Sequence, residues 1–153
     1  MDKSAPDTGT REDTSDKIMN VAVRLFAAHG FHGVSTKQIC DEAGANIAAV
    51  NYHFGSKENL YRAIVRRFGE VGFQRLAHLL KTPESADEMK VRLELFLDES
   101  VDLFRKAPDL SMMIFRDINL MEGLLKDIFE ASFLPLHKAV VTFLEGARKN
   151  GLI

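Results

Sequence analysis

The sequence is poor in the residues that build cross-linked, metal-binding or membrane-spanning proteins. Its 153 residues include one cysteine, four prolines and no tryptophan. The single Cys40 cannot form an internal disulfide and has no second cysteine for a metal knuckle, so we interpret it as a small buried apolar residue. The first stretch, MDKSAPDTGTREDT, is polar, and no later run is long enough to span a bilayer. These absences predict a cytoplasmic protein that does not enter membranes.

Motifs of the common enzyme classes are also missing. The five histidines and many acidic residues show no His-Glu-x-x-His spacing for zinc. The sequence has no glycine loop that would cradle phosphates and no nucleophile elbow. We therefore predict that the protein is not an enzyme, with no catalytic residues, no metal site and no cofactor.

Charge is distributed unevenly along the chain. Counting Asp, Glu, Lys and Arg, residues 1–16 carry two basic and five acidic side chains, and residues 68–153 carry eleven and fourteen. Residues 17–67 carry seven basic and three acidic side chains. Only this middle segment has a positive excess, which suits an approach to a polyanion.

Hydrophobic periodicity predicts an all-α protein without strands. In the first part of the chain the pattern predicts helices over residues 15–28, 36–43, 47–54 and 57–80. Ser35, Asn46 and Ser56 precede the last three as N-cap residues, and Gly30 and Gly44 stand where helices end. Two short helices joined by a tight turn and supported by a longer one form a helix-turn-helix.

The helix over residues 47–54 has two faces. On a helical wheel, Ile47, Val50 and Phe54 share the face that we expect to be buried. The outer face is smooth and consists of Ala48, Ala49, Asn51 and Tyr52. An asparagine can make paired hydrogen bonds with adenine in the major groove, and an alanine methyl can touch the thymine methyl.

Hydrogen-bond donors surround this smooth face. They suit phosphate oxygens and are Thr36, Lys37, Tyr52, His53 and Lys57. Thr36, Lys37 and Lys57 also lie in the first turns of their helices, where free backbone amides favour anions. Two alternatives stay open: Asn51 is a solvated surface residue, or His53 packs beside Phe54.

The stretch AVRLFAAHGFHGVSTKQICDEAGANIAAVNYHFGSKENLYRAI resembles the DNA-binding domain of TetR-type transcriptional regulators, without a gap from about residue 16 to residue 67. Within that family it is most similar to a subgroup near the CecR-like efflux regulators. The resemblance implies a DNA-binding repressor. It assigns Thr36, Lys37, Tyr52, His53 and Lys57 to the DNA backbone, and Ala48, Ala49 and Asn51 to base edges. Many family members have other residues at Ala48, Ala49 and Asn51, so the operator sequence does not carry over.

A polar break, KTPESADE, separates this region from a second helical one. We expect helices over residues 86–105, around SMMIF, and from about Gly123 onward, with a bend at Pro135. Apolar and polar side chains here are candidates for an effector pocket: Phe96, Phe104, Met112, Phe115, Arg116, Phe129, Phe133 and His137. The competing interpretation is that the Phe and Met residues are plain core.

The predicted organisation has three parts. Residues 1–14 form a disordered tail, residues 15–60 a TetR-type helix-turn-helix domain, and residues 61–153 a helical effector-binding and dimerisation domain. The resemblance implies that this last domain lacks the final two family helices. The expected partners are double-stranded DNA with an inverted-repeat operator, a small and largely apolar effector, and a second copy of the chain. The alternative function is a helical protein-interaction module that does not read DNA.

Overall fold

The computed structural model describes residues 9–117 and 123–153, and all regular structure within them is helical. The helices are α1 (Gly9–His29), α2 (Thr36–Ala43), α3 (Ile47–Phe54), α4 (Lys57–Leu79), α5 (Ala86–Lys106), α6 (Pro108–Arg116) and α7 (Lys126–Lys149). The predicted all-α fold class is confirmed. None of the helices in these two ranges is long and apolar enough to cross a membrane.

The three N-caps expected from the sequence are present. The Ser35 side chain accepts a hydrogen bond from the Gln38 amide, and the Gln38 side chain accepts one from the Ser35 amide, which makes a capping box. The Asn46 and Ser56 side chains cap α3 and α4 with one accepted bond each, from the Ala49 and Asn59 amides. Gly44 ends α2 in the left-handed conformation, at φ +64°, which an L side chain rarely adopts.

Helices α1 to α3 share one hydrophobic core with the start of α4. Ile18, Phe26, Val50 and Tyr61 are fully buried in it. The Tyr61 ring packs edge-on against Phe26, with centroids 5.0 Å apart. Cys40 is buried and free, as its sequence context predicted.

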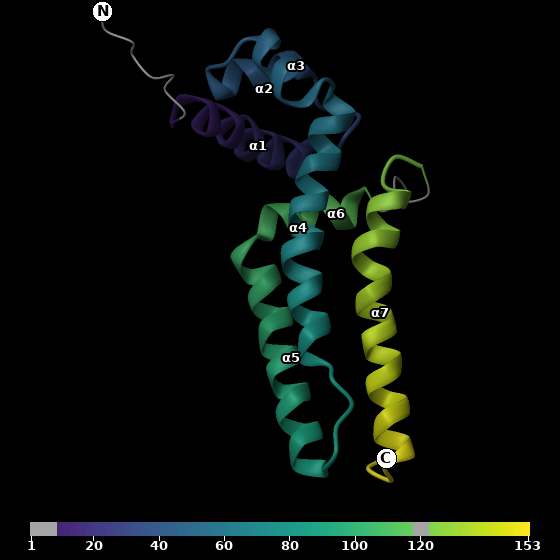
Figure 1. The fold of residues 1–153 in the computed structure, drawn as a ribbon. Helices are drawn as coiled ribbons and strands as arrows, with labels where there is room; N and C mark the ends of the chain where they lie inside the picture. Colours follow the sequence, from purple (N-terminus) through teal and green to yellow (C-terminus); the bar gives the residue numbers. More distant parts are fainter. Residues whose placement is uncertain (1–8, 118–122) are drawn as a thin grey trace, which may run out of the picture.

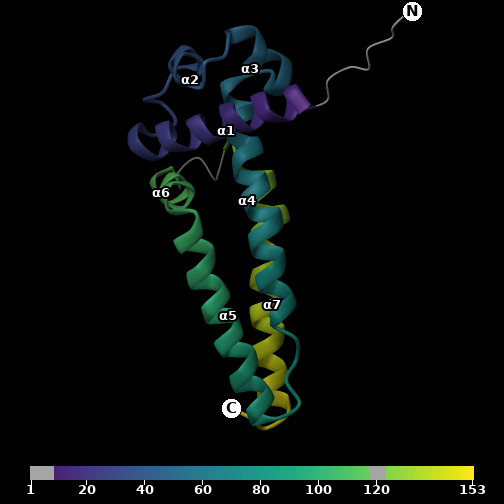
Figure 2. The same cartoon turned by 90° about the vertical axis from the view of Figure 1, so that its left-hand side faces the viewer.

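The helices form an elongated molecule in which α2 and α3 lie at one end and the carboxyl terminus at the other (Figure 1). Helix α4 runs from the first end to the second, with α5 and α7 along its sides and α6 across it (Figures 1 and 2). The α4 and α7 backbones approach closely at Gly69, where an added Cβ would lie 2.6 Å from Ser132 Oγ. Higher up, Arg62 on α4 forms a bidentate ion pair with Asp127 on α7.

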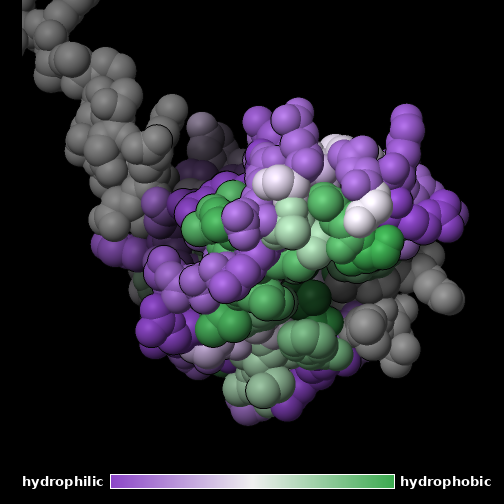
Figure 3. Space-filling model, turned by 90° about the horizontal axis from the view of Figure 1, so that it is seen from below, coloured by the Kyte–Doolittle hydropathy of each residue, from purple (hydrophilic) through white to green (hydrophobic). Residues whose placement is uncertain are grey.

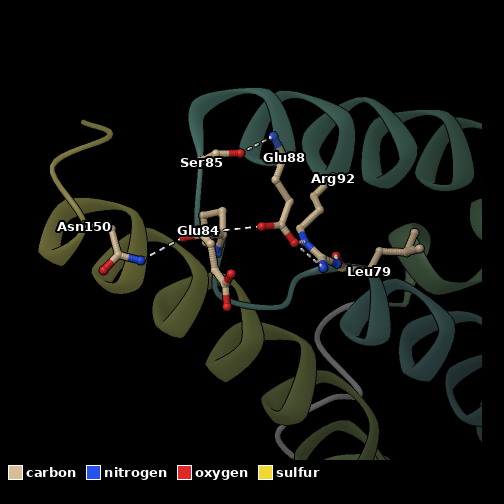
Figure 4. Close-up of polar contacts among 7 residues, drawn as sticks. Leu79, Glu84, Ser85, Glu88, Arg92 and Asn150 are labelled. Atoms are coloured by element: carbon tan, nitrogen blue, oxygen red, sulfur yellow. Dashed lines mark hydrogen bonds and ion pairs between the residues drawn. The ribbon is translucent and has the colours of Figure 1, made fainter.

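The α4–α5 connection is held by polar contacts from both sides (Figure 4). The Asn150 side chain donates to the Pro83 carbonyl at 2.9 Å, and Arg92 donates to the Leu79 carbonyl. Glu88 accepts from the Glu84 amide at 2.8 Å and pairs with Arg92. That amide and then Arg92 hold the pKa of Glu88 below its ordinary value. These contacts hold the α4–α5 connection against α5 and the end of α7.

Viewed from this same end, hydrophobic residues form a band across a hollow between hydrophilic rims (Figure 3). Helix α5 buries none of its residues completely. Exposed large hydrophobic side chains on α5 and α7 include Leu97, Val101 and Leu144. The region of α5 and α7 is consequently packed less tightly than the region of α1 to α3.

Two expected boundaries differ from the structure. Helix α1 begins at Gly9, so residues 9–14 belong to it rather than to the predicted tail, whose residues 1–8 lie outside the described part. Helix α7 begins at Lys126 instead of near Gly123. It contains Pro135 and continues past it, because Ala131, whose carbonyl loses its partner there, is exposed and can be hydrated. The bend expected at Pro135 stays a prediction.

The predicted division between residues 60 and 61 falls inside α4. Leu60, Tyr61 and Ile64 belong to the core around α1 to α3, whereas Leu76 packs in a separate cluster with α7 residues. Helix α4 is therefore shared by both regions, and the functional division of the chain stays a prediction.

Candidate nucleic-acid interface

The exposed face of helix α3 consists of small, polar and aromatic side chains. Ala48, Asn51 and Tyr52 are exposed, as the wheel predicted, while Val50 is fully buried beneath them. Ala49 was expected on the outside, but it is half-buried and packs against the core. The outer face is therefore narrower than the sequence pattern indicated.

Ile47 is the second correction on this helix. The wheel placed it inside, yet 51% of its surface is exposed. A wheel groups residues by direction but does not show how far neighbouring helices reach, and only Val50 in α3 lies fully within the core. An exposed branched side chain beside Ala48 adds methyl groups that can contact thymine. Its position directly after the Asn46 cap was a signal that sequence analysis could have weighed.

Lys37 lies in the first turn of α2 and is strongly exposed. Its Nζ is 2.6 Å from Asp41 Oδ2, one helical turn away. The hydrogen bond to Asp41 holds the pKa of Lys37 above its ordinary value, so the side chain carries a full positive charge. A phosphate would have to compete with Asp41 for this ammonium group.

Lys57 has a different environment from the one expected. Its Nζ donates to the carbonyls of Phe31 at 3.0 Å and Val34 at 2.8 Å. The same atom lies 4.4 Å from the centroid of the Phe31 ring. Lys57 thus ties the start of α4 to the turn between α1 and α2. Sequence analysis missed this role because both acceptors are backbone carbonyls more than 20 residues away.

The remaining residues that we predicted to contact the DNA backbone lie beside this surface. Thr36 is the first residue of α2 and is half-buried. The half-buried His53 ring lies 5.2 Å from the Tyr52 ring and 6.1 Å from the Phe54 ring, between centroids. His53 therefore has both a packing contact and a place next to the exposed Tyr52. The structure brings all eight predicted DNA-facing residues to one end of the molecule (Figure 1).

Residues at the end of α6 form hydrogen bonds to the turn between α1 and α2, which supports the surface of α2 and α3. Asp117 Oδ2 accepts from the Phe31 amide and from the Tyr61 hydroxyl, each at 3.0 Å. Burial and the nearby Asp117 raise the pKa of Tyr61, so its phenol stays protonated and donates. Arg116, predicted as a pocket residue, instead donates to the Ala28 carbonyl at 2.5 Å. Two consecutive residues thus connect α6 to the helix-turn-helix.

A cavity of about 320 Å³ lies between α4, α5, α6 and α7. Four of the predicted pocket residues line it, namely Phe104, Phe115, Phe129 and Phe133. The other four are not in its wall: Phe96 packs in the core at the far end, Met112 and His137 are exposed, and Arg116 points to α1. Sequence analysis missed the lining residues from α4, including Phe68 and Phe73, because it sought pocket candidates only after the polar break.

Two short capped helices joined through a left-handed glycine, with the second exposing an aromatic and amide face, define a helix-turn-helix protein. The family model described as "Bacterial regulatory proteins, tetR family" matches residues 18–64. Residues 18–64 are therefore similar to the amino-terminal domain of that family.

Individual relatives agree with the family. The HTH-type transcriptional repressor AcnR of Corynebacterium glutamicum is 34% identical over 92 residues, which cover 54% of this chain and 49% of AcnR. The probable HTH-type transcriptional regulator YttP of Bacillus subtilis is 26% identical over 139 residues, 90% of this chain and 66% of YttP. The chain thus spans between about half and two thirds of these relatives. The HTH-type dual regulator CecR of Shigella flexneri is 40% identical over 52 residues, 34% of this chain and 23% of CecR.

The fold is also that of a solved regulator. The crystal structure of HlyIIR, a hemolysin II transcriptional regulator, superposes with a TM-score of 0.67 at 24% identity, over 92% of this chain and 76% of that chain. These comparisons support the TetR family without singling out the CecR-like subgroup, because AcnR and YttP match as well. The named relatives are transcriptional regulators rather than enzymes. Among the residues described, no cluster of His, Cys, Asp and Glu could hold a metal ion.

Proposed function

We propose that the protein is a DNA-binding transcriptional repressor that acts from the cytoplasm on an inverted-repeat operator. The observation that carries this proposal is the exposed face of α3, with Asn51 and Tyr52 in its centre and Lys37 beside it. The similarity of the helix-turn-helix to that of AcnR, a transcriptional repressor, supports it. A homodimer would place two such helices in successive major grooves, about 34 Å apart along the duplex.

The residues of this face divide into two roles. Asn51 reads base edges, and Ala48 and Ile47 supply methyl contacts to thymine. Tyr52 and Lys37 reach the phosphate backbone. Ala49 supports the face from below because it packs against the core.

Three further residues act around the same face. Thr36 contributes its hydroxyl and a free amide at the start of α2, and His53 donates to a phosphate from its place beside Tyr52. Lys57 contacts DNA while it holds the α1–α2 turn, so its loss would affect both folding and binding.

Release from DNA follows from the position of α6. Ile114 and Phe115 line the cavity, and Arg116 and Asp117 directly after them hold the α1–α2 turn. A molecule that enters the cavity and shifts α6 would therefore change how the two helix-turn-helix units sit relative to each other. The effector must bind the free form better than the DNA-bound form, by the same factor as it weakens DNA binding.

The finer assignments rest on the resemblance. We place the chain near the CecR-like subgroup and assign residues 61–153 to effector binding and dimerisation. The 40% identity with CecR over 52 residues supports the first assignment, and the cavity supports the second. The alternative is a helical interaction module that does not read DNA, and it predicts that changes on α2 and α3 leave DNA affinity unaffected.

Lys37 and Lys90 offer a matched test of these two functions. Each has 74% of its side chain exposed and pairs with an acidic residue four positions later. Lys37→Met should weaken DNA binding and reduce the salt slope by about one per subunit, because one phosphate contact is lost. Lys90→Met should change neither quantity. Both are measured by fluorescence anisotropy of labelled DNA over a range of salt concentrations.

The interaction-module alternative would be favoured if the two variants bound DNA equally well. Thermal unfolding of both variants provides the control, since an exposed pair contributes little to stability. A loss of affinity in Lys37→Met without a loss of stability would place the effect at the DNA contact.

A further inference from the structure

The wall of the 320 Å³ cavity is dominated by one residue type. Six phenylalanines from four helices line it: Phe68, Phe73, Phe104, Phe115, Phe129 and Phe133. The remaining described lining residues are Val65, Gly69, Ser111, Ile114 and Ile128. None of these eleven residues carries a charge.

The rings are arranged around the space rather than packed into a single stack. Phe129 and Phe133 are stacked with centroids 4.7 Å apart, and Phe73 meets the edge of Phe133 at 5.9 Å. Phe104 and Phe115 form a second pair at 6.1 Å. Aromatic rings prefer offset stacks and edge-to-face contacts with other rings. Such a wall is complementary to a flat aromatic guest.

A charged guest would lose its hydration without compensation. None of the described lining residues is an Asp or Glu that could pair with a cation, or a Lys or Arg that could pair with an anion. The transfer of an unpaired, strongly hydrated ion such as a sulfonate or a primary ammonium into apolar surroundings costs far more than aromatic contacts return. The wall therefore selects against strongly hydrated ions of both signs.

Among the described lining residues, only Ser111 has a polar side chain. Its hydroxyl donates to the Ala107 carbonyl at 2.9 Å, and its oxygen keeps a lone pair that can accept a hydrogen bond. Ser132, whose side chain lies against Gly69, is not one of the lining residues. A ligand group that donates to the Ser111 oxygen would therefore replace a hydrogen bond that the ligand loses on leaving water.

We propose that the cavity binds an uncharged, flat aromatic molecule with a single hydroxyl or amine group that donates a hydrogen bond to Ser111. The role of this molecule as the effector rests on the proposed function, whereas its binding does not. The chemistry of the wall sets the class of ligand, and the oxygen of Ser111 sets its orientation.

A matched pair of fluorescent probes tests the exclusion of charge. N-phenylnaphthylamine is neutral, and anilinonaphthalene sulfonate carries a sulfonate on the same kind of ring system. The neutral probe should bind the full chain at one saturable site, about tenfold or more tighter than the anion. A primary ammonium derivative of naphthalene should also bind more weakly than the neutral probe, because its charge is strongly hydrated in water. Equal or tighter binding of either ion would overturn the proposal.

Two neighbouring residues on α7 locate the bound probe. Phe133 lines the cavity and is 37% exposed, whereas Leu134 is 40% exposed and does not line it. Phe133→Ala should weaken binding of the neutral probe about tenfold, because it removes one ring of the wall and that ring's contacts with Phe73 and Phe129. Leu134→Ala should change the affinity less than about twofold. An equal effect of both changes would place the probe elsewhere and contradict the proposal.

The hydrogen bond to Ser111 has its own test. Naphthol and methylnaphthalene differ in a hydroxyl and a methyl group of similar size, and both can displace the neutral probe. Ser111→Ala should raise the ratio of the naphthol Kd to the methylnaphthalene Kd about tenfold relative to the unchanged chain. An unchanged ratio would contradict the hydrogen bond to Ser111, and far-ultraviolet circular dichroism confirms that the variant is folded.

The probe measurements contain no DNA, so they test the ligand class independently of the proposed function. If the neutral probe binds in the cavity but leaves DNA affinity unchanged at saturation, release by the effector fails while the ligand class stands. If DNA binding is sequence-specific but ions bind the cavity as well as neutral rings do, the ligand class fails while the DNA-binding function stands.

Discussion

The DNA-facing end of the molecule and the region beyond it differ in how tightly they are packed. Among the described residues, eighteen buried ones form a single core that joins α1 to α3 with the start of α4, α6 and the start of α7, whereas four form the cluster at the far end. Side-chain caps do not separate the two regions, because α5 has one, Ser85, as α2, α3 and α4 do. The comparison teaches that the DNA-facing end is held in one geometry and that the space between its core and the far cluster keeps room for a ligand.

The largest expected difference is between two phenylalanines. Phe26 is fully buried, whereas Phe104 is 41% exposed at the cavity. Phe26→Ala should lower the free energy of unfolding by about 3–5 kcal/mol, and Phe104→Ala by about 1 kcal/mol, because little new void forms at a surface position. Urea unfolding of both variants measures the difference. Equal losses would mean that the core and the cavity wall are packed alike.

A smaller effect is expected where the two ends are joined. Asp117→Ala leaves the Phe31 amide and the Tyr61 hydroxyl without their acceptor. The free energy of unfolding should fall by about 2–3 kcal/mol, since the lost bonds go to a charged group. Asp109→Ala, an exposed position on the same helix, is the control and should cost about 0.5 kcal/mol. If the two variants were equally stable, α6 would not hold the α1–α2 turn.

The smallest effect compares two serines. Ser35 caps α2, while Ser100 lies inside α5 and donates to the Phe96 carbonyl. Ser35→Ala should cost about 1 kcal/mol of stability because the α2 amides lose their cap. Ser100→Ala should be neutral or stabilising by about 0.5 kcal/mol, since alanine is the better helix former. Thermal unfolding distinguishes the two, and an equal cost would show that the caps do not set the rigidity of the DNA-facing end.

Much of the DNA-facing end was predictable because local rules determine it. The caps Ser35, Asn46 and Ser56 and the left-handed Gly44 were all read from short-range patterns. Lys57 and Asp117 were not, since their partners lie 23 to 86 residues away in sequence. Ile47 was misplaced because a wheel gives direction without the reach of neighbouring helices.

The sequence indicated that an apolar pocket could form, but it did not show which residues line it. A run of Phe and Met at helical spacing indicates either core or pocket, and only tertiary packing decides between them. Phe129 and Phe133 line the cavity, whereas Phe96 on α5 packs into the far cluster. The contribution of α4 could not be inferred, because Phe68 and Phe73 look like ordinary core residues in its pattern.

The central claim is that the exposed face of α3 reads DNA sequence, and one measurement tests it most directly. Genomic DNA fragments bound by the full chain at near-physiological salt are selected and sequenced, in parallel with those bound by an Asn51→Ala variant. We predict that the unchanged chain enriches one inverted repeat and that the variant loses or relaxes this preference at defined positions. Enrichment of no sequence, or of the same sequence to the same extent by both proteins, would contradict the claim.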